Sequence, residues 1–238
     1  MVNWEELIRE YNDMRYFATD PVAVVRRCTE QRDIEVMGVI CSWLALGNRN
    51  QIFKKCCFAY ELMQGKPYDY LMSEEWRRYK DSRVNFYRMF FYCDFHDLMQ
   101  SLYDVYRQYR TLEEAVIVRS EEFVKSEFKY LDALILLFNA NGIPKNNKSA
   151  CKRLCLFLRW MVRRDGIVDL GVWRNLEPAK LLIPLDVHVN RIARQYGLLV
   201  RSSADMRAVE ELTQNCRKLY PNDPTIMDFA LFGAGYNE

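Results

Sequence analysis

The sequence is poor in the residue patterns that mark metal-dependent proteins. It has only two histidines, and none of its eight cysteines forms a CxxC pair. Structural zinc and iron–sulfur sites are built from clusters of cysteines and histidines. A metal centre is therefore not expected, even at Cys151 and Cys155, which lie on one helical stripe. Without a signal peptide, the cysteines are expected to be reduced, mostly buried thiols of a cytosolic protein.

Other common sequence signals are also absent. No apolar run approaches membrane-spanning length. We find no GxGxxG motif, strand alternation, internal repeat or low-complexity segment. The net charge is only +2, so any surface for a nucleic acid must be local. These absences exclude a membrane partner and leave a helical protein.

Helical periodicity is present in nearly every segment, and the predicted class is all-α. Half of the 238 residues are apolar, enough for a sizeable core in one large domain or two small ones. Helices are expected at about residues 3–12, 20–28, 33–47, 50–65, 96–110, 111–125, 130–140, 150–164, 186–197, 205–219 and 225–234.

Basic residues are concentrated in one region although the total charge is small. Seven basic residues and no acid lie between Lys145 and Arg164. Arg191 and Arg194 follow on the helix that starts at Asp186. Such a face can be simply solvated, or it can track the phosphates of a nucleic acid.

The segment IPLDVHVNRIARQYGLL, residues 183–199, predicts a helix that begins at Asp186 and stops at Gly197. N-capping alone explains an aspartate at a helix start, because its side chain accepts backbone N–H bonds. His188, taken alone, is explained equally well as a structural or exposed residue. The same backbone amides, with His188 beside them, can instead bind a DNA phosphate.

This segment and its basic helix resemble a signature of the helix-hairpin-helix DNA glycosylase superfamily, (V/I)P(V/L)D(V/T)H, in its 8-oxoguanine glycosylase version. DFALFGAG, residues 228–235, resembles the last helix of the archaeal branch, where an aspartate and an aromatic four positions later line the base pocket. ICSWLALGNRNQIFKK, residues 40–55, resembles an early helix–loop–helix of the superfamily. The chain also looks like an uncharacterised bacterial family, chiefly in KRLCLFLRWMVRRD and PLDVH.

The resemblance implies a fold and a pair of catalytic residues. The fold would be one domain, residues 1–238, whose two helical subdomains meet at a cleft, with a hairpin-like element at about 139–164. Asp186 would be the catalytic carboxylate. Lys152, 34 residues earlier, would be the nucleophile, as the spacing in the archaeal branch allows. The superfamily's LPG(V/I)GxK-like turn is absent here, so Lys148 stays open as the alternative.

These residue types suit base excision. Cleaving a base from its sugar builds positive charge on the sugar, and a fixed carboxylate at Asp186 stabilises that charge. A neutral Lys152 amine can attack the sugar carbon and form a Schiff base, which allows strand cleavage by β-elimination. Neighbouring Arg153 and Lys148, with partial burial, favour the neutral amine. The alternative is that Lys152 is one more cation facing phosphate.

The damaged base must leave the stack, so a pocket and a filler are needed. Phe232 would stack on the base and Asp228 would accept hydrogen bonds from a purine, whose protonated N7 distinguishes 8-oxoguanine from guanine. The loop that would fill the vacated position consists of Asn48, Arg49, Asn50 and Gln51. Core packing of Phe232 and capping by the loop are the structural alternatives. The other predicted DNA contacts are His188, Lys148, Arg153 and Arg191.

The main hypothesis is therefore a monomeric DNA glycosylase with AP lyase activity, cytoplasmic and associated with the nucleoid. It would act on double-stranded DNA that contains an oxidised purine, with no metal or organic cofactor. A second hypothesis is a non-catalytic DNA- or RNA-binding protein that keeps the fold and the basic face. A third is a helical scaffold for a protein partner.

Overall fold

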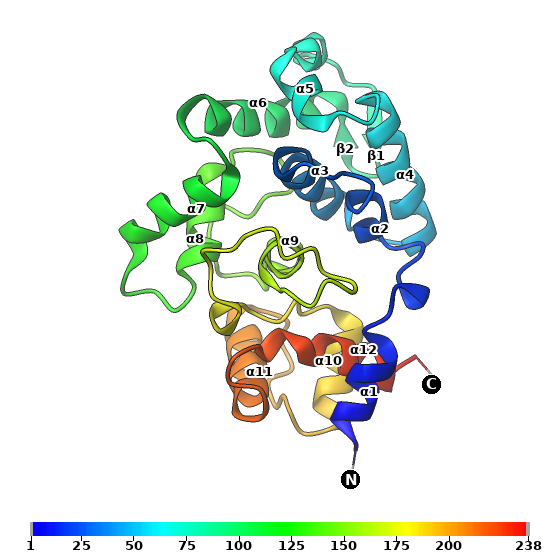
Figure 1. The fold of residues 1–238 in the computed structure, drawn as a ribbon, viewed down its shortest axis with the longest axis vertical. Helices are drawn as coiled ribbons and strands as arrows, with labels where there is room; N and C mark the ends of the chain where they lie inside the picture. The colour runs from blue at the N-terminus through cyan, green and yellow to red at the C-terminus, as the bar shows by residue number, and fades with distance from the viewer. Residues whose placement is uncertain (1, 237–238) are drawn as a thin grey trace. The chain divides into compact units, whose positions relative to one another are not determined.

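Residues 2–236 are described by a computed structural model, and they are mostly helical (Figure 1). Helices hold 60% of these described residues and strands 3%, which confirms the predicted all-α class. The chain divides into two compact units. The discontinuous unit joins residues 1–18 to 146–238, and the inserted unit comprises residues 19–145. Within residues 2–236, no helix combines the length and hydropathy needed to cross a membrane.

The inserted unit is organised around α3, which is buried almost all round, as its apolar sequence predicts. Helices α2, α4 and α5 pack against it. On α3, the Trp43 ring stacks on Phe90 at 4.2 Å between centroids, and its indole N–H donates to the Asn141 carbonyl at 2.8 Å. The helices are α2 (Pro21–Val25), α3 (Gln31–Leu44), α4 (Arg49–Leu62), α5 (Pro67–Met72), α6 (Tyr92–Gln108), α7 (Leu112–Ser120) and α8 (Lys129–Leu137), with 3-10 turns η2 (Glu75–Tyr79) and η3 (Glu121–Phe123).

A short β-hairpin in the inserted unit departs from the expected helical pattern. Strands β1 (Asn85–Tyr87) and β2 (Phe90–Phe91) pair antiparallel with an irregular register. The turn holds Arg88 at φ 51°, and the Asn85 side-chain amide donates to the Arg88 carbonyl at 2.7 Å. The strands are too short to produce a readable alternation, so the sequence did not reveal them.

The discontinuous unit is built around α12, which packs against α1 and α10 (Figure 1). Gly233 makes the first of these contacts close, because a Cβ there would overlap the Tyr11 ring. Trp160 and Trp173 are fully buried. The elements are α1 (Trp4–Tyr11), η1 (Met14–Tyr16), α9 (Lys152–Val162), η4 (Pro178–Lys180), α10 (Val187–Gln195), α11 (Met206–Leu219), η5 (Pro224–Ile226) and α12 (Met227–Ala234).

The eight cysteines are free thiols, and six of them are buried, as the sequence predicts. Burial raises the pKa of the Cys28 and Cys216 thiols to about 12, so both stay protonated. Within residues 2–236, no three His, Cys, Asp or Glu side chains are grouped so that they can hold a metal ion.

Candidate functional site

Helix α9 begins at Lys152 because the preceding residue departs from helical geometry. Cys151 is the N-cap, with φ 46° and ψ 30°, a left-handed conformation that is uncommon outside glycine. Further along α9, the side chains of Leu154 and Phe157 are buried. Lys152 is thus held at the first turn, with 36% of its side chain exposed.

Asp186 is fixed by the start of α10. The segment before it is buried, and the Ile183 amide donates to the Thr213 hydroxyl at 3.1 Å. The Asp186 Oδ1 accepts the Val189 amide at 2.8 Å, which is the N-cap that the sequence predicts. The helix ends before Gly197, whose φ of 69° also matches the prediction. Capping uses only one carboxylate oxygen.

The second oxygen of Asp186 meets the candidate lysine. The Lys152 Nζ lies 3.1 Å from Asp186 Oδ2, and about a third of each side chain is exposed, 36% and 35%. The pair joins residues far apart in the sequence, within one compact unit. An amine and a carboxylate are therefore side by side and accessible to a ligand.

Lys148, the alternative nucleophile, is held differently. Its carbonyl accepts the Met206 amide at 3.2 Å, and the neighbouring Ser149 forms an isolated antiparallel bridge with Asp205. These contacts tie the main chain to the start of α11. The Lys148 side chain is exposed and forms no ion pair with any residue in 2–236. Of the two lysines, Lys152 is the one that contacts Asp186.

Asp228, predicted for the base pocket, is buried on α12 and bonded to Arg159 of α9 through Oδ2. Burial raises the pKa of the Asp228 carboxyl to about 6; Asp186 adds to the rise, while Arg159 and Lys152 oppose it. The charges of Lys152 and Asp186 therefore act on Asp228. The Arg159 bond leaves the other oxygen, Oδ1, for another donor.

Arg159 belongs to a buried ion network that the sequence did not predict. Its Nε donates to Asp169 at 3.2 Å, and Asp169 also accepts from Arg163 at 3.0 Å. Arg163 further pairs with Asp165 and, at 2.7 Å, with Asp223. Asp169 is fully buried, and the two arginine side chains are each 3% exposed. The basic stretch that we interpreted as a surface thus turns two of its arginines inward.

Phe232, the predicted stacking residue, lies in an aromatic cluster. Its ring centroid is 5.4 Å from that of Phe17, 6.0 Å from Tyr11 and 5.6 Å from Tyr236. Phe17 and Tyr11 are buried, whereas Tyr236 is 56% exposed. Phe232 itself is half-buried, one helical turn after Asp228. It is part of the packing and is also partly exposed.

Comparison with known proteins identifies the family. A family model described as a protein of unknown function, DUF2400, matches residues 20–237. The chain belongs to the DUF2400 family. No curated protein and no solved structure matches the chain.

His188 of the DUF2400 chain faces inward rather than toward solvent. Its ring lies against Gly235, the C-cap of α12, where a Cβ would overlap the imidazole. The Nε2 atom is buried and has no hydrogen-bond partner within residues 2–236. Of the other predicted DNA contacts, Arg191 is exposed, and Arg153 is half-buried, with its pKa lowered by burial. His188, which we predicted to contact phosphate, thus turns its Nε2 toward the end of α12.

The predicted filler residues lie at the start of α4 in the inserted unit. The Asn48 side chain caps that helix, accepting the Asn50 and Gln51 amides at 3.0 and 3.3 Å. Arg49 pairs with Asp20 at 3.5 Å. The capping alternative is therefore confirmed for Asn48. Asn50 and Gln51 are exposed, and insertion of this loop into DNA stays a prediction.

Proposed function

We propose that this DUF2400 protein is a DNA glycosylase with an associated lyase activity, acting on an oxidised purine in double-stranded DNA. The observation that carries the proposal is the 3.1 Å contact between the Lys152 amine and the Asp186 carboxylate, about a third of each side chain being exposed. The helical fold is compatible with the helix-hairpin-helix architecture. The corresponding hairpin-like element would span about residues 139–164, from the irregular segment after α8 through α9.

Asp186 has the geometry of an electrostatic catalyst. Its Oδ1 is fixed by the Val189 amide, so Oδ2 can face a developing cation without reorganising. In base excision that cation is the sugar, as the bond to the base breaks and its electrons leave with the base. A carboxylate that is already fixed stabilises this charge at little cost when the reaction occurs.

Lys152 would act as the nucleophile. Its amine must lose a proton before it attacks the sugar C1′, and Asp186 Oδ2 is the acceptor in contact with it. Attack forms the Nζ–C1′ bond and displaces the base, which leaves with the electrons of the C1′–N bond and takes up a proton. The C1′–O4′ bond then breaks, the ring oxygen takes up a proton, and an imine between Nζ and C1′ results. β-Elimination removes a proton from C2′, forms the C2′–C3′ double bond and breaks the C3′–O bond, so that the 3′ phosphate leaves. Hydrolysis of the imine by water restores the amine.

Asp228 and Phe232 would recognise the base. One Asp228 oxygen is bonded to Arg159, so the other can accept a purine N–H. An oxidised purine protonated at N7 supplies this donor, whereas guanine presents a lone pair to the carboxylate at that position. Phe232, half-buried on the same helix, offers a ring for stacking.

Borohydride trapping on duplex DNA containing 8-oxoguanine tests the proposal. We expect a covalent protein–DNA adduct with the native chain and with Lys148→Ala, and none with Lys152→Ala. Lys148→Ala is the matched control, because it removes an exposed lysine four residues away. An adduct that persists in Lys152→Ala would reject the assigned nucleophile.

Two other outcomes favour the rival hypotheses. Salt-dependent DNA binding without adduct or base release would indicate a non-catalytic nucleic-acid-binding protein that uses exposed cations such as Lys148 and Arg191. No DNA binding even at low salt would leave a helical scaffold for a protein partner.

A further inference from the structure

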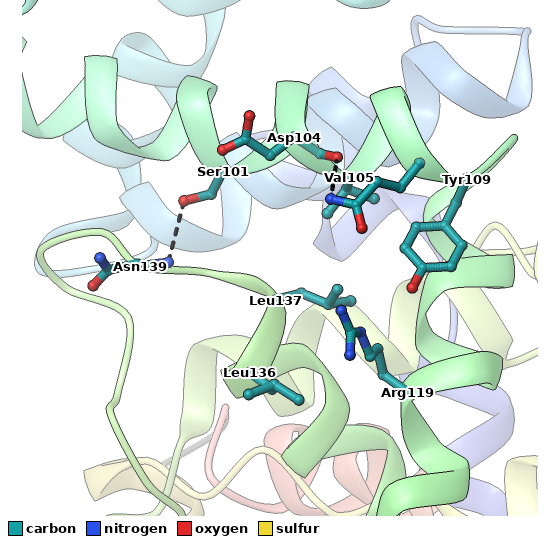
Figure 2. Close-up of a pocket in the computed structure, with 9 residues that line it drawn as sticks. Ser101, Asp104, Val105, Tyr109, Arg119, Leu136, Leu137 and Asn139 are labelled. Carbon is teal, nitrogen blue, oxygen red and sulfur yellow. Dashed lines mark hydrogen bonds between the residues drawn. The ribbon is translucent and has the colours of Figure 1, made fainter.

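Polar side chains of the inserted unit are commonly paired with a neighbour. In the cavity of about 230 Å³ that α6, α7 and α8 line, the Ser101 hydroxyl donates to the Asp97 carbonyl at 3.0 Å and accepts the Asn139 amide at 3.1 Å (Figure 2). Lys55 of α4 is different. Its amine forms no ion pair and no hydrogen bond with any residue in 2–236.

The Lys55 amine lies in a corner between aromatic rings instead. Its Nζ is 3.8 Å from the ring centroid of Phe58, on the same helix, and 3.8 Å from that of Phe86, on β1. These two rings are inclined by 67°, with centroids 6.2 Å apart, so they form two walls. The Tyr92 ring, at the start of α6, lies 6.0 Å from the amine. Phe86 is buried and stacks on Phe95, which fixes one wall.

This aromatic corner gives the amine no acceptor among residues 2–236. A protonated amine carries three N–H donors, and ring faces attract its charge but offer no strong acceptor. Burial lowers the pKa of the Lys55 amine to about 8, against an ordinary value of 10.5. The Tyr92 hydroxyl supplies no opposing charge, because burial raises its pKa. The neutral amine is therefore available close to neutral pH.

The amine is also open to a reagent. Lys55 is half-buried, and its Nζ is not among the buried polar atoms that lack a partner. Phe58 is 39% exposed, so one wall of the corner lies at the surface. A desolvated amine with a free lone pair and an open side has the properties of a nucleophilic lysine.

We propose that Lys55 is an acylation site, at which the amine held between Phe58 and Phe86 takes a short acyl group from an acyl phosphate or an acyl thioester. The two kinds of donor share one chemistry, a carbonyl carbon bonded to a good leaving group. The amide that forms carries no charge, so acylation removes an ammonium that has no counter-ion in the corner. The site belongs to the inserted unit and is independent of the proposed base excision.

The reaction needs only the amine and the acyl donor. The lone pair of neutral Nζ attacks the carbonyl carbon and forms the N–C bond. The C–O bond to phosphate, or the C–S bond of the thioester, then breaks, and its electron pair leaves with the phosphate or the thiolate. Nζ gives up one proton, which the leaving group or water takes, and the amide keeps one N–H.

Competitive acetylation tests the site within one chain. The native protein is treated with acetyl phosphate or with the acetyl thioester of N-acetylcysteamine, and acetylation of the two lysines of α4 is quantified by peptide mass spectrometry. Lys54 is the internal control, because it is exposed on the same helix. At about pH 7.5, we expect at least one donor to acetylate Lys55 at least about tenfold faster than Lys54. In about 8 M urea the two lysines should react alike.

The two donors distinguish the source of the acyl group. Selective acetylation of Lys55 by either donor supports the proposal, and the faster donor identifies the source. Equal rates at Lys54 and Lys55 in the folded chain with both donors, or a difference that persists in urea, would overturn it.

Variants of the two α4 phenylalanines test the aromatic corner. Phe58→Ala removes one wall and admits water, so the pH midpoint of Lys55 acetylation should rise from about 8 by about one pH unit. Phe53→Ala is the matched control and should leave the midpoint unchanged, because the Phe53 ring lies near the Arg27 guanidinium instead. A native midpoint near the ordinary lysine value, or equal midpoints in the two variants, would contradict the role of the corner.

Discussion

Helices α10 and α11 begin in nearly the same way. Asp186 and Asp205 are both N-caps in extended conformation, with φ and ψ of −114° and −176° for the first and −122° and −178° for the second. Each accepts the backbone amide three residues later, from Val189 at 2.8 Å and from Ala208 at 3.2 Å. As caps, the two aspartates are equivalent.

The two aspartates differ in the cation that each one meets. Asp205 pairs with Arg201, four residues earlier, and this hydrogen bond lowers the pKa of Asp205 to about 2. Asp186 pairs with Lys152, which comes from a different helix. A local pair forms whenever the turn forms, but a long-range pair requires the folded unit. The comparison indicates that local contacts, the cap and the Arg201 pair, account for both oxygens of Asp205, whereas the local cap accounts for only one oxygen of Asp186.

The largest effect is expected at an aspartate that has no capping role. Asp169 is fully buried and pairs with both Arg159 and Arg163, so Asp169→Asn removes the carboxylate that the two buried guanidinium groups share. We expect a loss of about 3–5 kcal/mol in the free energy of unfolding, measured by urea denaturation. Asp205→Asn should cost far less, because asparagine also caps helices and the Arg201 pair is at the surface. Similar losses in the two variants would contradict this assignment.

The next largest effect is expected on the rate of base release, which should distinguish the two capping aspartates. Asp186→Asn keeps a capping side chain but removes the charge, so we expect turnover on 8-oxoguanine DNA to fall by about 100-fold or more. DNA affinity should stay within about threefold. Asp205→Asn is the matched control and should retain turnover within about threefold. Equal rates in the two variants would remove Asp186 from the chemistry.

Asp228 provides a pH-dependent test that is independent of catalysis. Its pKa is about 6 in the folded chain against an ordinary value of 3.8 for an aspartate, so the folded state holds the proton more tightly. Asp228 therefore contributes stability at acid pH that is lost as the pH rises through about 6. Relative to Asp228→Asn, the native chain should be more stable at about pH 5 than at about pH 7.5, measured by urea midpoints. A pH-independent difference would exclude the raised pKa.

The smallest effect is expected from the stability contribution of the candidate pair itself. About a third of each side chain is exposed, so solvent screens the Lys152–Asp186 attraction. Lys152→Met should change the free energy of unfolding by less than about 1 kcal/mol, measured under the same conditions as Asp169→Asn. A loss comparable to that of Asp169→Asn would mean that the pair is structural.

The sequence predicts the helices well because their boundaries depend on local chemistry. Asp186 and Gly197 bound α10 as expected, and the helices expected near residues 205–219 and 225–234 are α11 and α12. The β-hairpin was missed because two strands of three and two residues leave no periodic signal. Local periodicity thus predicts most of the helices but does not predict the strand pairing.

Only those residues of the candidate site that lie within short sequence motifs could be predicted. The PLDVH segment placed Asp186, but no local pattern could show that Arg159 reaches Asp228, 69 residues away, or that Asp169 lies between two arginines. Charge counting also treats all basic residues alike, although burial separates Arg159 and Arg163 from exposed Lys148 and Arg191. Such distinctions arise from tertiary packing.

The packing of α1 on α12 has a consequence for how this protein is made. Residues 19–145 form one continuous unit, whereas the unit holding Lys152 and Asp186 needs both α1 and α12. On the ribosome, α1 is made before residues 19–145, and α12, on which it docks, is made after them. The inserted unit can thus fold while synthesis continues, and the lysine–aspartate unit is completed only after α12 has been translated.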